Sequence, residues 1–228
     1  VEHVETGRQW TVALRGNTVA RKTTAVSLVL DRSGSMNEPR GDGVPKIVGL
    51  KEAAKLFVRL AHEGDGIGAV QYNADVQGDI AIAPLGSILD PLDPARTAVT
   101  TFVDALVASG GTSIGDGLER GRQLLDATSA FDREAMVVIT DGKETSPKWI
   151  SDVAGTIDAT TYGLGIGTAA NINAATLQAL TGNSGGYLLV TGPLVGDTEQ
   201  ILMKYFLQIL AGISNADVLL DPEGHIAI

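Results

Sequence analysis

Three short apolar runs, too uniform to face water on either side, constrain the fold of this chain more than any other feature. They span residues 24–30, 135–140 and 160–166. A strand with one wet face alternates apolar and polar side chains, whereas a strand covered on both faces reads as a nearly continuous apolar run. Segments with helical spacing separate these runs. The pattern predicts a doubly wound α/β fold, with a mostly parallel central sheet and helices on both faces.

Apolar residues three and four positions apart predict the helices. In the segment 46–61, for example, Leu50, Ala53 and Phe57 share one face. The strands expected at 66–72 and 76–82 are too close for a crossover helix, so we expect one antiparallel strand at an edge of the sheet. The expected strands are 24–30, 66–72, 76–82, 135–140, 160–166 and 186–190, and the expected helices are 46–61, 95–108, 116–127, 173–180 and 197–210.

The two ends of the chain differ from its centre. Residues 10–20 predict a β-hairpin that turns at 15–17, and residues 216–228 predict another that turns at 221–224. We therefore divide the chain into an N-terminal β extension (1–22), a central domain (23–212) and a C-terminal β extension (213–228) that begins a truncated β-rich domain. The chain opens without Met, so we expect a fragment of a longer protein, whose other domains are among its partners.

Charge and composition exclude several classes of protein. The chain has 27 Asp and Glu against 17 Lys and Arg, and no basic cluster is present, so we expect no nucleic-acid partner. The absence of cysteine excludes thiol catalysis, iron–sulfur clusters and cysteine zinc sites. No apolar stretch approaches the roughly 20 residues that span a bilayer, so we expect no direct membrane insertion. The cellular compartment stays open.

Polar side chains follow two of the buried strands directly. Asp31, Ser33 and Ser35 come after the run 24–30, and Asp141 comes after 135–140. Between them, Thr112 stands in a glycine-rich loop that opens a helix. Ligands of doubly wound folds bind at the carboxyl ends of the strands. These side chains supply only oxygen, which suits hard cations such as Mg²⁺, Mn²⁺ or Ca²⁺.

These segments resemble the von Willebrand factor type A domain, which also occurs in integrins as the I domain. The matching text is Val29–Met36, Gly110–Leu118, Val138–Gly142 and Tyr162–Gly167, and the resemblance covers about residues 23–212. It implies a metal-ion-dependent adhesion site formed by Asp31, Ser33, Ser35, Thr112 and Asp141. By the same resemblance, the hydroxyls bind the ion directly or through water, and the aspartates bind it largely through water.

This site predicts binding rather than catalysis. Neutral hydroxyls around an ion leave it most of its charge, so an open coordination position favours an anionic oxygen from outside. We therefore expect a divalent-metal-dependent protein-binding module, not itself an enzyme, that captures a Glu or Asp carboxylate of a protein partner through Mg²⁺, Mn²⁺ or Ca²⁺.

Two other motifs compete with this interpretation. Gly111–Gly115 matches G-x-S-x-G, and the order Ser113, Asp197, His225 is that of an α/β serine hydrolase. A nucleophile elbow must follow a strand, however, and residues 95–108 have helical spacing. The second motif, Arg40-Gly41-Asp42, spells an adhesion tripeptide, for which chance is the better explanation.

Overall fold

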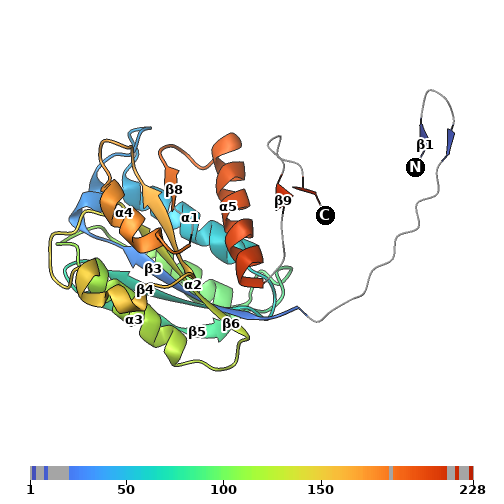
Figure 1. The fold of residues 1–228 in the computed structure, drawn as a ribbon, viewed down its shortest axis with the longest axis horizontal. Coiled ribbons are helices and arrows are strands. Elements are labelled where there is room, and N and C mark those ends of the chain that lie inside the picture. Colours follow the sequence, from blue (N-terminus) through green and yellow to red (C-terminus); the bar gives the residue numbers. More distant parts are fainter. Residues whose placement is uncertain are drawn as a thin grey trace.

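The computed structural model describes residues 2–3, 8–9, 21–184, 187–214, 219–220 and 226–227. A six-stranded sheet with the order β5-β4-β3-β6-β7-β8 forms its centre (Figure 1). Every neighbouring pair is parallel except β4 and β5, which are antiparallel at the edge, as expected. The strands are β3 (Thr24–Asp31), β4 (Gly66–Tyr72), β5 (Val76–Pro84), β6 (Arg133–Thr140), β7 (Thr161–Ile166) and β8 (Tyr187–Val190).

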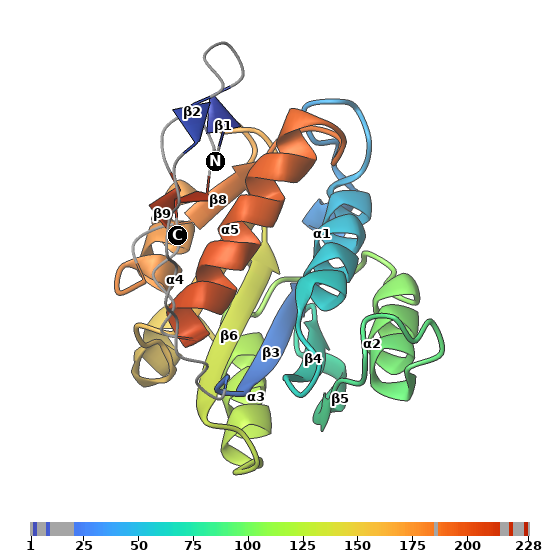
Figure 2. The same cartoon turned by 90° about the vertical axis from the view of Figure 1, so that its right-hand side faces the viewer.

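Helices cover both faces of this sheet, which confirms the predicted doubly wound fold. Figure 2 shows α1 and α5 across the near face, with α3 behind the sheet. Alternate residues of β3 serve the two sides: Leu28 packs in the core with α1, α2 and α5, and Val29 packs in the core with α3 and α4. The helices are α1 (Lys46–Leu60), α2 (Pro94–Asp104), α3 (Ile114–Asp126), α4 (Ala174–Thr181) and α5 (Asp197–Ser214), with 3₁₀ helices η1 (Gly34–Asn37) and η2 (Ile150–Thr156).

The burial of each strand explains its sequence. All of β3 is buried, because β4 and β6 flank it and helices cover both of its faces. Strand β5 lies at the edge, and its residues alternate between exposed and partly buried over most of its length. The continuous apolar runs therefore mark the central strands.

Two of the expected helix boundaries are corrected by the structure. Helix α2 ends at Asp104 instead of 108, and the chain beyond it is not helical, so that the backbone N–H of Ser109 donates to the carbonyl of Arg32. Helix α3 begins at Ile114 instead of 116, because the Ser113 side chain caps it by accepting from the N–H of Asp116. The short helices η1 and η2 carry too few residues for a periodic signal and were not predicted.

The terminal segments contribute two small strand pairs. Strands β1 (Glu2–His3) and β2 (Arg8–Gln9) pair antiparallel, whereas the hairpin predicted for 10–20 lies outside the described residues. Strands β9 (Leu219–Leu220) and β10 (Ile226–Ala227) pair antiparallel where the second hairpin was predicted. The division of the chain into a domain and two extensions stays a prediction. None of the described helices has the length and apolar character needed to cross a membrane.

Candidate metal site

The predicted site residues lie where the sheet changes its direction of winding. From β3 the chain continues to β4 on one side, whereas β6 leads to β7 on the other. Asp31 is the last residue of β3, and Asp141 directly follows β6. Because β3 and β6 are parallel neighbours, both aspartates lie at the same edge of the sheet. This switch point is where doubly wound folds hold their ligands.

Backbone hydrogen bonds join the three loops that carry the predicted residues. The N–H of Gly34 donates to the carbonyl of Gly110 at 2.9 Å, which links the first loop to the second. The N–H of Thr145 donates to the carbonyl of Thr112 at 3.0 Å, which links the second loop to the third. A Cβ on Gly34 would lie only 3.1 Å from the Gly110 oxygen, so the close approach favours glycine there.

The two serines are spaced as neighbouring ligands of one ion would be. Ser33 Oγ lies 3.1 Å from Ser35 Oγ. Adjacent ligands of an octahedral Mg²⁺ with bonds of about 2.1 Å are separated by about 3 Å. The N–H of Ser33 donates to Asp31 Oδ1 at 2.8 Å and so holds the loop against the end of β3.

Two fully buried carboxylates give this edge its charge. Asp31 and Asp141 have no exposed surface, and Thr140 Oγ1 donates to Asp31 Oδ2 at 2.6 Å. Burial, together with the negative charge of Asp141, raises the pKa of Asp31 to about 6. A buried carboxylate that is repelled by another is stabilised when a cation binds between them.

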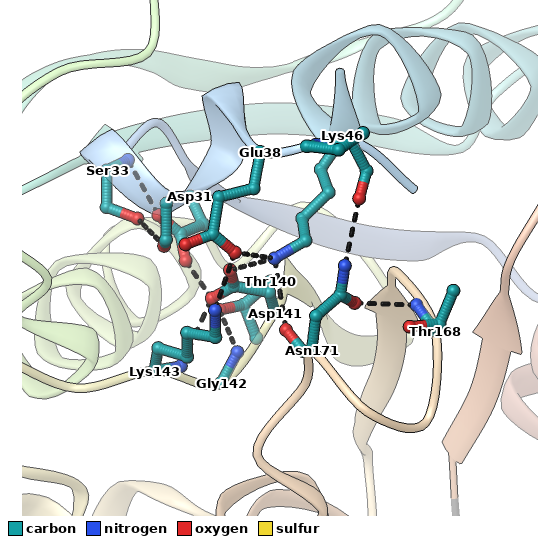
Figure 3. Close-up of polar contacts among 12 residues, drawn as sticks. Asp31, Ser33, Glu38, Lys46, Thr140, Asp141, Gly142, Lys143, Thr168 and Asn171 are labelled. Atoms are coloured by element: carbon teal, nitrogen blue, oxygen red, sulfur yellow. Dashed lines mark hydrogen bonds and ion pairs between the residues drawn. The ribbon is translucent and has the colours of Figure 1, made fainter. Parts of the chain in front are cut away.

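Lysine side chains neutralise part of this charge (Figure 3). Lys46 Nζ donates to Asp141 Oδ2 at 2.8 Å, to Glu38 Oε2 at 2.8 Å and to the carbonyl of Asn171 at 3.0 Å. Lys143 Nζ donates to the same Glu38 oxygen at 2.6 Å, and the N–H of Lys143 donates to Asp141 Oδ1 at 3.1 Å.

Sequence reasoning missed Thr140, Lys46 and Glu38. Thr140 had a signal, because it is a polar residue at the end of an otherwise apolar strand. Lys46 had none, since a lysine at the start of a helix usually lies on a solvated surface.

The donor set fits a hard divalent cation. Two carboxylates and three hydroxyls supply oxygen alone, which suits Mg²⁺ or Mn²⁺ better than zinc. Within the described part of the chain, no group of three or more His, Cys, Asp or Glu side chains could hold a metal ion. Any ion at this edge would therefore depend on the hydroxyls of Ser33, Ser35 and Thr112.

Comparison with known proteins decides the family. Residues 26–198 match the von Willebrand factor type A domain. The chain belongs to this family. The calcium-activated chloride channel regulator 1 of Equus caballus is 30% identical to it over 162 residues, which are 71% of this chain and 16% of that protein. This von Willebrand factor type A (VWA) chain thus spans less than a fifth of the length of that relative.

Solved structures share the fold of this VWA domain. A von Willebrand factor type A protein from Catenulispora acidiphila is 20% identical with a TM-score of 0.63, over 87% of this chain and 44% of that one. The pilus adhesin SpaC from Lactobacillus rhamnosus GG is 15% identical with a TM-score of 0.62, over 84% of this chain and 31% of that one. At these identities the likeness shows the fold alone.

Ser113 of the VWA domain has the geometry of a helix cap, not of a nucleophile. It follows a loop rather than a strand and is fully buried. Its Oγ donates to Asp116 Oδ2 at 2.7 Å and accepts from the N–H of Lys148 at 2.8 Å. His225, the third residue of the hydrolase alternative, lies outside the described residues.

We expect Ser113→Ala to destabilise the VWA domain by about 1–3 kcal/mol, because it removes the cap and leaves the part-buried N–H of Lys148 without this acceptor. Urea unfolding measures the loss, with Ser151→Ala, at an exposed serine, as the control. Esterase activity that is present in the wild type and disappears in Ser113→Ala would instead favour the hydrolase alternative.

In the Arg40-Gly41-Asp42 tripeptide, the arginine forms ion pairs within the VWA domain itself. Arg40 is 4% exposed. Its Nε donates to Asp42 Oδ1 at 3.0 Å, and its Nη1 donates to Glu52 Oε2 at 3.1 Å. A buried guanidinium paired with the aspartate of the same tripeptide is not presented to a receptor, so the motif has a structural role here.

Proposed function

We propose that this chain is a divalent-metal-dependent protein-binding module. In this proposal Asp31, Ser33, Ser35, Thr112 and Asp141 hold Mg²⁺ or Mn²⁺, and the bound ion takes a Glu or Asp carboxylate of a partner protein. The main support is the 3.1 Å separation of the two serine hydroxyls, at the same edge of the sheet as the two buried carboxylates Asp31 and Asp141.

The residues of the chain would divide the work between binding and charge. The hydroxyls of Ser33, Ser35 and Thr112 would donate lone pairs without adding negative charge. When bound, the ion supplies an electrophilic position for an incoming carboxylate. Because the aspartates lie at the ends of central strands, they are fixed in place before any ligand arrives. Such a contact should exceed the 0–1 kcal/mol or so of an exposed salt bridge.

Family membership supports an interaction role for the chain. The VWA fold is shared with a solved pilus adhesin, SpaC. We extend from this only the coarse role of protein binding, since the likeness is one of fold. The surface that would select the partner consists of the loops around the site, among them residues 37–44 and 143–149.

Calorimetric titration of Mg²⁺ and Mn²⁺ into chain stripped with EDTA tests the metal step. We expect saturable binding and a higher melting temperature, since an ion at 100 times its dissociation constant stabilises the folded state by about 2.7 kcal/mol. EDTA should reverse the shift. No heat of binding and no change in melting temperature at millimolar ion would overturn the proposal.

Peptide binding tests the carboxylate step separately. Partner peptides selected on the Mn²⁺-loaded chain should contain an essential Glu or Asp, and Gln or Asn in its place should remove binding. Selected peptides that bind equally well in EDTA would contradict metal-dependent capture.

A further inference from the structure

Lys46 is the first residue of α1, and its side chain is completely buried beside the candidate site. Lysine is almost never fully buried without a partner, because removing an ammonium from water is costly. The position is also unusual for its charge, since a cation at the start of a helix is opposed by the helix dipole. A specific set of contacts must therefore hold it there.

The contacts of Lys46 account for every proton of its ammonium. An ammonium has three donors, and here they meet Asp141 Oδ2, Glu38 Oε2 and the carbonyl of Asn171 (Figure 3). Burial lowers the pKa of Lys46, but its hydrogen bonds with Asp141 and Glu38 outweigh that effect and hold the pKa above its ordinary value. An amine that donates to three acceptors at once, two of them carboxylates, must carry all three protons and is therefore charged.

Lys46 changes the charge that a metal ion would meet. It cancels one of the two buried carboxylates, Asp31 and Asp141. The remaining ion pair of the network, Glu38 with Lys143, lies at the rim and is neutral as a pair. A divalent ion at the site would therefore leave a net positive centre, whereas the same site without Lys46 would be neutral once loaded.

We propose that Lys46 is a positioning residue that sets ligand selectivity: it fixes the Asp141 carboxylate and makes the loaded site cationic. This lowers the affinity for the metal ion and raises the affinity for a carboxylate ligand. The inference rests on the proposed function and names the residue that favours an anionic partner over a neutral one.

Titration of Mn²⁺ into wild type, Lys46→Met and Lys143→Met tests the first half. We expect Lys46→Met to bind Mn²⁺ roughly tenfold or more tightly, since a cation a few ångströms away is removed from a low-dielectric site. Lys143→Met is the matched control: it removes the same charge from the same Glu38 oxygen, but its side chain is one-third exposed. Its affinity should change less than about threefold, because solvent screens it.

Acetate titrated into the Mn²⁺-loaded chain tests the second half, with water-proton relaxation as the readout because acetate displaces water bound to manganese. We expect acetate to bind Lys46→Met roughly tenfold more weakly than wild type, the reverse of the change for the ion. A lysine with a merely structural role would not move the two affinities in opposite directions.

Glu38→Gln keeps the inference testable if Lys46→Met fails to fold. Glu38 is partly exposed, and its substitution removes the negative charge that pairs with Lys46. The site becomes more positive, so Mn²⁺ should bind more weakly and acetate more tightly. If Mn²⁺ binds wild type but neither variant shows its opposed pair of changes, the role of Lys46 is overturned and the proposed function stands. If wild type and both variants bind no Mn²⁺, the proposed function itself is overturned, and this inference with it.

Discussion

Replacing Asp31 with asparagine is expected to stabilise the metal-free domain and to abolish its response to Mg²⁺ and Mn²⁺. Asp31 is fully buried, and burial with the charge of Asp141 raises its pKa from 3.8 to about 6. Its ionised form therefore opposes folding at neutral pH, by up to about 3 kcal/mol for a shift of this size. Asparagine retains the carbonyl that accepts from Ser33 but removes the charge that a cation needs.

The raised pKa of Asp31 also predicts the direction in which the stability of the metal-free domain changes with pH. A carboxyl group with a raised folded-state pKa favours folding fully below its unfolded value near 3.8, and this contribution disappears as the pH rises through about 6. In EDTA, the Asp31 contribution to the wild-type free energy of unfolding should thus fall between about pH 4 and pH 6. The difference between Asp31→Asn and wild type should grow over the same interval.

Urea unfolding in EDTA and in Mn²⁺ measures both effects. Asp126→Asn, at an exposed carboxylate at the end of α3 that lies away from the site, is the control and should change neither quantity by more than about 0.5 kcal/mol. An Asp31→Asn variant that still gains stability from Mn²⁺ as the wild type does would show that Asp31 is not part of a cation site.

Replacing Phe206 with alanine is expected to destabilise the domain by about 3–5 kcal/mol, the usual cost of deleting a buried aromatic ring. Phe206 is fully buried in α5 and meets Phe57 of α1 edge to face, with ring centroids 5.0 Å apart. This contact joins the last described long helix to the first, so its loss leaves a cavity between them.

Thermal and urea unfolding of Phe206→Ala should be compared with Ile201→Ala in the same helix. Ile201 is 53% exposed, so its truncation should cost less than about 0.5 kcal/mol. Equal losses for the two variants would mean that α5 is not anchored through its buried face.

The sequence predicts the central sheet well, because a strand that is buried on both faces contains few polar residues. Strand β3 is largely apolar because it is covered on every side, and the three residues between β4 and β5 exclude a parallel connection. The predicted end of α2 was wrong because Leu106 and Ala108 are apolar residues that are buried outside the helix. Periodicity cannot distinguish such burial from helix formation over a single turn.

The candidate site, too, could be predicted from the sequence only in part. Asp31 and Asp141 could be placed at one edge of the sheet, because each directly follows an apolar run that predicted a buried strand. The network of Lys46, Glu38 and Asn171 could not be predicted, since Asn171 is 125 positions from Lys46 in the chain and each of the three resembles an ordinary surface residue. Such contacts depend on how α1 begins and on how the loop after β7 turns, which single-sequence patterns do not specify.

The direction of β3 has a mechanical consequence. Arg21 and Thr23 attach the start of β3 to Asp65 and Asp132, at the edge of the sheet opposite the candidate site. A pull between residue 21 and a ligand held at Asp31 would stretch β3 lengthwise between its parallel neighbours β4 and β6. The hydrogen bonds on both sides of β3 would then be loaded in shear and would have to break together rather than one after another. This geometry resists a higher pulling force.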